Sequence, residues 1–142
     1  DNVVATKNII EACKKNAESN RSSFKITNDF DEGFKGAHVV YPKAWGSGYC
    51  FNYTDETGKT VKKADHVKAE EVNTAALGWK TTRKQMALVD KNGVYMHCLP
   101  ADRGQEVDDD VIDGPQSIVI DEAENRLHAH KAIMAMIMGG RL

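Results

Sequence analysis

The feature that most constrains the fold is a short apolar segment that runs straight into a turn rich in reactive groups. Residues 94–96, Val-Tyr-Met, indicate a buried strand, and His-Cys-Leu-Pro follows at residues 97–100. The proline fixes its own backbone angle and so stiffens the bend after the imidazole and the thiol. In open α/β sheets, ligands bind at the carboxyl ends of the strands. This turn therefore predicts a site at one edge of a sheet.

The segments before this strand alternate between helical and strand patterns. Residues 2–18 predict an amphipathic helix, residues 24–26 a short strand, residues 29–35 a helix that Gly36 ends, and residues 39–41 a second strand. This alternation is typical of a parallel sheet whose strands are joined by crossover helices.

The rest of the chain continues the alternation after a polar interruption. Residues 49–66 are rich in turn formers and predict a hairpin or excursion around residues 55–58. Helices are predicted over residues 67–77, from Thr81 or Thr82 through Val89, over 108–112 and over 121–138, and a further strand over 117–120. Residues 132–138 are apolar nearly all round, which a surface helix tolerates only where something covers it.

Composition narrows the class of partner. The 142 residues are enough for one domain with a sizeable core. Nineteen basic and 21 acidic residues give a net charge of −2, which offers no electrostatic case for nucleic acid or an anionic membrane, so a small-molecule partner is expected. No apolar run reaches the roughly 18 residues that a membrane span needs.

Cysteine usage favours a reducing compartment. The three cysteines are an odd number without metal-ligand spacing, which favours free thiols in a cytoplasmic protein and predicts no bound metal. The chain begins with Asp rather than Met, which we interpret as the start of a fragment of a longer protein.

Two motifs together resemble a known enzyme family. His-Cys-Leu-Pro at residues 97–100 is followed by Asp-Glu-Ala-Glu-Asn-Arg-Leu-His at residues 121–128. The pair resembles the signature of the second, amino-acid-binding domain of ornithine-type carbamoyltransferases, and the similarity covers nearly the whole chain. The resemblance implies a Rossmann-like three-layer α/β domain over residues 1–142 with a mostly parallel sheet. It also implies that a carbamoyl phosphate domain is missing and that residues 121–142 form a long helix that packs on it.

The resemblance implies a reaction and a set of residues. Such enzymes move the carbamoyl group of carbamoyl phosphate to the side-chain amine of ornithine or of an N-acylated ornithine-like amino acid, in arginine biosynthesis, as cytoplasmic homotrimers without a cofactor. His97, Cys98 and Arg126 are then catalytic, and Cys98, Leu99 and Arg126 bind carbamoyl phosphate. Donors preorganised at the carbonyl oxygen stabilise the charge that develops there. Arg126 offers a permanently charged fork for this purpose, and Cys98 positions substrate without becoming covalently attached.

Each of these residues also has a structural interpretation, which for Cys98 is that of a small buried residue rather than a nucleophile. His97 would be a satisfied histidine that caps a strand. Glu122 and Glu124 would neutralise Arg126 on the same helix, where a cation near the N-terminus is disfavoured by the helix dipole. Beside Arg126, the residues Glu122, Glu124 and Asn125 are expected to orient their surroundings.

Lys43 and Trp45 carry the prediction of substrate specificity. Residues 38–46 lack the aspartate and the Ser-Met-Gly loop with which plain ornithine carbamoyltransferases recognise a free α-ammonium. The segment is similar to the knotted branch that includes N-acetylornithine carbamoyltransferase, so Lys43, Trp45, His97 and Leu99 are expected to hold the amino acid. A lysine ammonium donates to an acyl carbonyl and repels an α-ammonium.

Other functions stay open at this point. The acyl group is undecided, since Asp102 stands where the acetylornithine enzymes have a basic residue. A non-catalytic amino-acid-binding or regulatory module of the same fold is the main alternative. A nucleotide-binding Rossmann domain is disfavoured, because no Gly-x-Gly-x-x-Gly turn is present.

Overall fold

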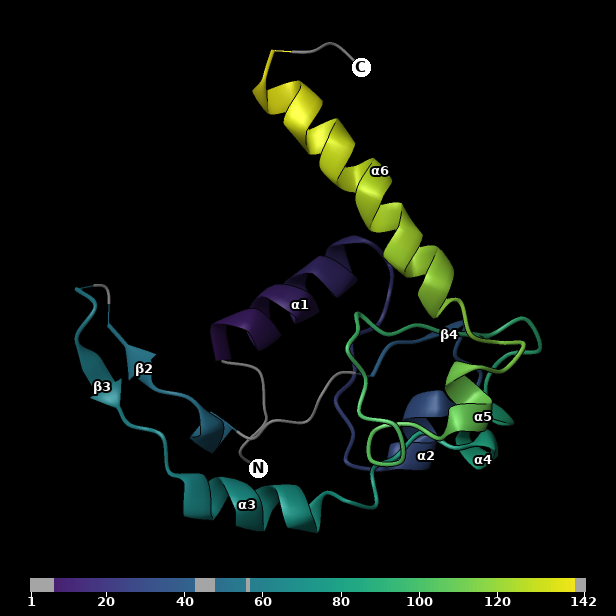
Figure 1. Cartoon of the computed structure of the whole chain (residues 1–142), viewed down its shortest axis with the longest axis horizontal. Coiled ribbons are helices and arrows are strands. Elements are labelled where there is room, and N and C mark those ends of the chain that lie inside the picture. The colour runs from purple at the N-terminus through teal and green to yellow at the C-terminus, as the bar shows by residue number, and fades with distance from the viewer. Residues whose placement is uncertain (1–6, 43–47, 56, 140–142) are drawn as a thin grey trace. The chain divides into compact units, whose positions relative to one another are not determined.

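The computed structural model describes residues 7–42, 48–55 and 57–139 (Figure 1). The chain divides into two compact units, which are considered separately. The first comprises Asp1–Asp29 and Trp45–Ala76, and the second comprises Phe30–Ala44 and Leu77–Leu142.

The described residues of the first unit form two helices, one 3-10 turn and a hairpin. Its elements are α1 (Lys7–Ser19), the 3-10 turn η1 (Gly48–Cys50), β2 (Tyr53–Thr54), β3 (Thr60–Lys62) and α3 (His66–Ala75). Strands β2 and β3 pair antiparallel, which confirms the predicted hairpin. Asp55 shapes its turn, because its Oδ1 accepts hydrogen bonds from the N–H of Thr57 and of Lys59. Asp65 caps α3 by accepting from the Lys68 N–H.

The strand predicted over residues 24–26 is wrong. Residues 22–27 have no regular secondary structure, and Phe24 and Ile26 are 37% and 52% exposed. A strand exists only where its backbone groups find a partner strand. The alternation of Phe24 and Ile26 is typical of a strand, but it does not show whether a partner strand lies beside them.

The second unit is built around a parallel pair of strands. Its elements are α2 (Phe30–Phe34), β1 (Val39–Val40), α4 (Arg83–Met86), β4 (Val94–Tyr95), α5 (Asp109–Ile112) and α6 (Val119–Ile137). Strand β1 pairs with β4 in parallel, with Val39 beside Val94 and Val40 beside Tyr95. This pairing confirms the predicted α/β class and the parallel sheet.

The core of the second unit lies against these strands. Its buried members are Phe34, Val40, Met86, Tyr95, Val107, Val111, Ile112 and Val119. Gly93 leads into β4 at a point too crowded for any other residue, because an added Cβ would lie 2.7 Å from both Ala37 O and Val89 Cγ2. Gly36 ends α2 with φ of 67°, as predicted from its position.

Two helices of this unit begin as predicted. Thr82 caps α4 by accepting from the Lys84 N–H, and Thr82 and Gln85 form a capping box. The helix ends at Met86, earlier than the predicted Val89. Helix α5 occupies the predicted segment, and its C-terminal end is followed by Gly114.

The strand predicted over residues 117–120 is largely replaced by the start of α6. Residues 116–118 make only a short ladder with β4, in which the Tyr95 N–H donates to Gln116 O and the Ile118 N–H donates to Tyr95 O. Helix α6 then begins at Val119, with Asp121 and Glu122 in its first turn. Acidic residues there favour a helix N-terminus, which explains why the apolar run does not continue as a strand.

The C-terminal half of α6 presents a largely apolar surface to solvent. The exposed fractions are 52% for Ile133, 54% for Met134, 62% for Met136, 79% for Ile137 and 84% for Met138. Figure 1 shows α6 extending away from the short helices α4 and α5 of its own unit. Among the described residues, no helix is long and apolar enough to cross a membrane.

Candidate functional site

Three segments of the second unit meet where β1 and β4 end. Tyr41 follows β1, the turn 97–100 follows β4, and Glu122 lies in the first turn of α6. Glu122 Oε1 accepts a hydrogen bond of 2.7 Å from the Tyr41 hydroxyl, and Glu122 Oε2 accepts one of 3.0 Å from the His97 backbone N–H. We call Tyr41, the turn 97–100 and Glu122 the strand-end site.

The His97 side chain lies inside the turn. It is 2% exposed, and its Nδ1 accepts a hydrogen bond of 3.0 Å from the Leu99 N–H. Nδ1 therefore carries no proton, and a neutral ring is protonated on Nε2. Nε2 lies 3.3 Å from Glu106 Oε2, close enough for an electrostatic contact but without the angles of a hydrogen bond. Both ring nitrogens thus face protein groups, and the predicted direct donation to substrate stays a prediction.

Glu106 completes a buried polar chain behind the turn. It is 5% exposed, and its Oε2 also accepts a hydrogen bond of 2.9 Å from the Asp102 N–H. The Tyr95 side chain is fully buried, and burial together with the charge of Glu106 raises the pKa of its hydroxyl to about 12. Tyr95 is therefore a neutral phenol at physiological pH.

Cys98 and Leu99 form the outward side of the turn. Cys98 is exposed, and Leu99 is 38% exposed with a φ of 48°. A non-glycine residue with positive φ is held there by its surroundings and is typical of functional sites. Within the described part of the chain, the backbone carbonyls of Cys98 and Leu99 accept no hydrogen bond. Each of these two oxygens therefore keeps its capacity to accept a hydrogen bond.

Tyr41 is held as a hydrogen-bond donor. The hydrogen bond to Glu122, partial burial and the negative charge of Glu122 raise the pKa of the Tyr41 phenol to about 12, with a further contribution from Cys98. Tyr41 is 47% exposed, so the pair lies at the surface of the site.

Arg126 lies one helical turn beyond Glu122 on the exposed part of α6. Residues four apart share one face of a helix, so α6 places Arg126 on the side that faces the strand-end site at Glu122. Among the described residues, Arg126 makes no ion pair, and the predicted neutralisation by Glu122 or Glu124 is not formed. Asn125 donates instead to the Asp121 carbonyl over 2.9 Å.

Two of the predicted site residues lie outside the described part of the chain, and two residues that contact the turn 97–100 or Glu122 were not predicted. Lys43 and Trp45 lie outside the described residues. Tyr41 was assigned only to a strand, although its position at a strand end was a usable signal. Glu106 carries no local signal, because its relation to His97 arises only from the folding of residues 97–107.

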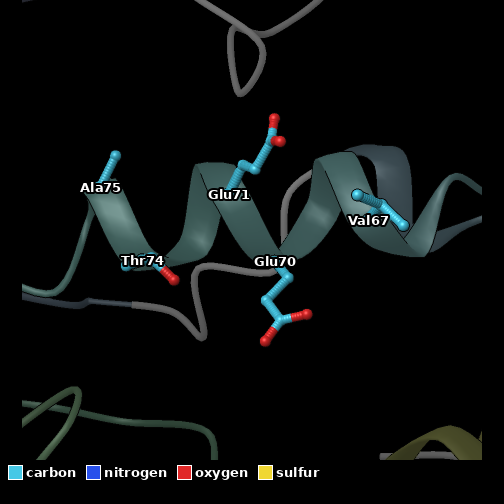
Figure 2. Close-up of a pocket in the computed structure, with 5 residues that line it drawn as sticks. All are labelled: Val67, Glu70, Glu71, Thr74 and Ala75. Atoms are coloured by element: carbon cyan, nitrogen blue, oxygen red, sulfur yellow. The ribbon is translucent and has the colours of Figure 1, made fainter.

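Two surface hollows of the described residues lie away from the strand-end site. Figure 2 shows one along α3, where Glu70 and Glu71 point in different directions beside Val67, Thr74 and Ala75. A second lies between α4 and α5, over Met86 and Val111. Neither of these two hollows includes a residue of the strand-end site. The described residues hold no group of acidic, histidine and cysteine side chains suited to a metal ion.

Residues 1–137 match the model of the aspartate/ornithine carbamoyltransferase Asp/Orn-binding domain. Similar sequences include the ornithine carbamoyltransferase of Caldicellulosiruptor saccharolyticus, 40% identical over 96% of this chain and 39% of the relative. The anabolic ornithine carbamoyltransferase of Pyrococcus furiosus is 36% identical over 93% of this chain and 37% of the relative.

Solved structures are similar over the same extent. One is a variant of N-acetyl-L-ornithine transcarbamylase complexed with carbamyl phosphate and N-succinyl-L-norvaline, with a TM-score of 0.78 and 32% identity over 95% of this chain and 37% of that one. Another is the Pyrococcus furiosus ornithine carbamoyltransferase, with a TM-score of 0.74 and 34% identity over 96% of this chain and 39% of that one. The predicted fold class and the predicted family resemblance, including its acetylornithine branch, are confirmed. The chain spans well under half the length of these relatives.

Proposed function

The chain belongs to the aspartate/ornithine carbamoyltransferase family as an Asp/Orn-binding domain, and from this premise we propose a function for the whole protein. It transfers the carbamoyl group of carbamoyl phosphate to the side-chain amine of ornithine or of an N-acylated ornithine-like amino acid. Support comes from the ornithine carbamoyltransferases among its relatives and from the N-acetyl-L-ornithine transcarbamylase complexed with carbamyl phosphate.

The observation that carries this proposal concerns Cys98 and Leu99, two exposed residues of the strand-end site, whose carbonyls accept no hydrogen bond from the described residues. A neutral amine attacks the carbonyl carbon of carbamoyl phosphate, so a C–N bond forms, the bond from carbon to the phosphate oxygen breaks, and phosphate leaves. The amine gains positive charge during attack and loses one proton, which the departing phosphate takes up. The carbonyls of Cys98 and Leu99 can accept its N–H groups and so aim its lone pair at the electrophile.

Each predicted site residue keeps a role in this proposal. Arg126 binds carbamoyl phosphate with its guanidinium fork and stabilises charge on the carbonyl oxygen. Cys98 and Leu99 line both substrates. His97 supports them from behind, because its ring accepts the Leu99 N–H and so holds the backbone of the turn. Its catalytic contribution is therefore exerted through the turn.

Lys43 and Trp45 are assigned to the acyl end of the amino acid. The ammonium of Lys43 would donate to an acyl carbonyl or a carboxylate, and the indole of Trp45 would cover the acyl group. The similarity to N-acetyl-L-ornithine transcarbamylase supports this assignment.

The remaining features of the proposal concern the whole protein. Residues 1–142 act as the amino-acid domain, beside a carbamoyl phosphate domain on which residues 121–142 pack. The exposed methionine and isoleucine side chains of α6 support that packing. The assembly is a cytoplasmic homotrimer. The reaction needs no cofactor, because the leaving group is already activated as a phosphate.

The test is ureido product formation by the full-length source protein. Carbamoyl phosphate is supplied with ornithine, N-acetylornithine or N-succinylornithine. Turnover of an acylated substrate only supports the proposed function and the roles of Lys43 and Trp45. Turnover of free ornithine alone supports carbamoyl transfer but contradicts those two roles. Absence of turnover with all three contradicts the function and favours a non-catalytic binding module.

A further inference from the structure

We propose that Glu122 is a positioning residue that clamps the ends of β1 and β4 together and fixes the face of α6 that carries Arg126. This inference rests on the proposed function, since its consequence is the geometry of carbamoyl transfer. Glu122 itself contacts no substrate in this arrangement.

Both carboxylate oxygens of Glu122 are used, and each holds a different strand end. Oε1 accepts from the Tyr41 hydroxyl, 81 residues away in the sequence, and Oε2 accepts from the His97 N–H, 25 residues away. Hydrogen bonds to an ionised acceptor are shorter and about twice as strong as neutral ones. A single side chain therefore ties β1 to the turn that follows β4.

The start of α6 is fixed to the same strand by its backbone. The Ile118 N–H donates to the Tyr95 carbonyl, and the Glu122 N–H donates to the Ile118 carbonyl, over 3.0 and 2.9 Å. Glu122 thus reaches the strand ends from a helix whose start is already hydrogen-bonded to β4. The start of α6 therefore has little freedom to carry Glu122 away from the strand ends.

Two groups of the proposed reaction depend on this clamp. The His97 N–H belongs to the turn that presents the Cys98 and Leu99 carbonyls, so losing its partner loosens that turn. Arg126 lies four residues beyond Glu122 on α6, so the direction of Glu122 toward the strand ends also sets the direction of Arg126. Glu122 therefore aligns the carbonyls of Cys98 and Leu99, which hold the amine, with Arg126, which binds carbamoyl phosphate.

The clamp predicts an asymmetry between two substitutions. In Glu122→Gln, the amide oxygen can still accept from the His97 N–H, and the amide NH₂ can donate to the Tyr41 oxygen, because a hydroxyl both donates and accepts. In Glu122→Ala, both partners are lost. Glu124 offers a matched control, because it is exposed on the same helix and has no partner within the described part of the chain.

The first experiment tests the clamp without substrates. Tyrosinate absorbance is titrated in the full-length protein, and the Tyr41→Phe curve is subtracted to isolate Tyr41. We expect its pKa to be near 12 in the unmodified protein and to fall toward the ordinary value of about 10 in Glu122→Gln, with no change in Glu124→Gln. A Tyr41 pKa that does not respond to Glu122→Gln overturns the clamp, whether or not the protein transfers carbamoyl groups.

The second experiment tests the positioning role by steady-state kinetics. We expect kcat to fall about 10- to 100-fold in Glu122→Ala, with a smaller change in KM, because the reacting groups are displaced more than they are lost. Glu122→Gln is expected to recover most of this loss, and Tyr41→Phe, which removes one arm at an exposed residue, to give an intermediate kcat. The positioning role is wrong if kcat is the same in Glu122→Ala and Glu124→Ala. It is also wrong if kcat falls as much in Glu122→Gln as in Glu122→Ala. An inactive unmodified protein with a responsive Tyr41 contradicts the proposed function and leaves the clamp intact.

Discussion

Among individual side chains, Glu106 has the largest predicted effect on stability. It is 5% exposed, and it is the acceptor for the Asp102 N–H and the neighbour of His97 Nε2. Glu106→Ala removes the acceptor of the Asp102 N–H and opens space beside the buried His97 ring, so we expect a loss of about 2–4 kcal/mol in the free energy of unfolding. Urea denaturation of the full-length protein measures it. Glu124→Ala, at an exposed residue, should change stability by less than about 0.5 kcal/mol.

Arg126 should show the opposite behaviour, with activity affected and stability unchanged. Its side chain is exposed and makes no ion pair among the described residues, so folding does not depend on it. If it stabilises charge on the carbonyl oxygen, Arg126→Ala lowers kcat/KM for carbamoyl phosphate about 100- to 1,000-fold. Arg126→Lys retains the charge without the fork and should recover only part of the loss. Unchanged carbamoyl transfer by Arg126→Ala would remove this residue from the proposed site.

Between helices, Asp31 connects α2 to α4 and gives the fold an acid-sensitive contact. Its carboxylate accepts from Lys84 Nζ and from Gln85 Nε2, each over 2.9 Å, and these bonds hold the pKa of Asp31 below its ordinary value. A depressed carboxyl pKa stabilises the fold above the unfolded-state value, and this stability is lost as the pH falls through the folded-state value. The stability difference between the unmodified protein and Asp31→Asn should therefore be present at pH 7 and shrink below about pH 4. Denaturant midpoints of the two proteins, measured at pH 7 and below about pH 4, give this stability difference. A difference that does not change with pH would contradict the role of Asp31 as an acid-sensitive contact.

The same helices and strands show how far the sequence determines the fold. Thr82, Gly36 and the turn at Asp55 act through their immediate neighbours, so their structures could be predicted. Residues 24–26 and 117–120 are short apolar runs whose conformation depends on whether a partner strand lies beside them, and their sequences do not contain that information. In the site, His97, Cys98 and Leu99 could be predicted because they directly follow a strand. Tyr41 also directly follows a strand and offered the same signal, whereas Glu106 could not be predicted, because its role comes from contacts made only after folding.

For the protein as a whole, the apolar end of α6 predicts a buried contact in the full-length chain. Ile137 is 79% exposed here, and the relatives are more than twice as long as this chain. If residues 121–142 pack on a carbamoyl phosphate domain, Ile137→Asp buries an unpaired charge in that contact and should cost about 2–4 kcal/mol of stability. Thermal denaturation of the full-length protein measures it. Ile120→Asp is the control, because Ile120 is 73% exposed in the first turn of the same helix, where an acidic residue is favourable. If the two substitutions lower the stability by equally small amounts, the end of α6 is exposed in the whole protein too. The two domains would then be held together by another contact.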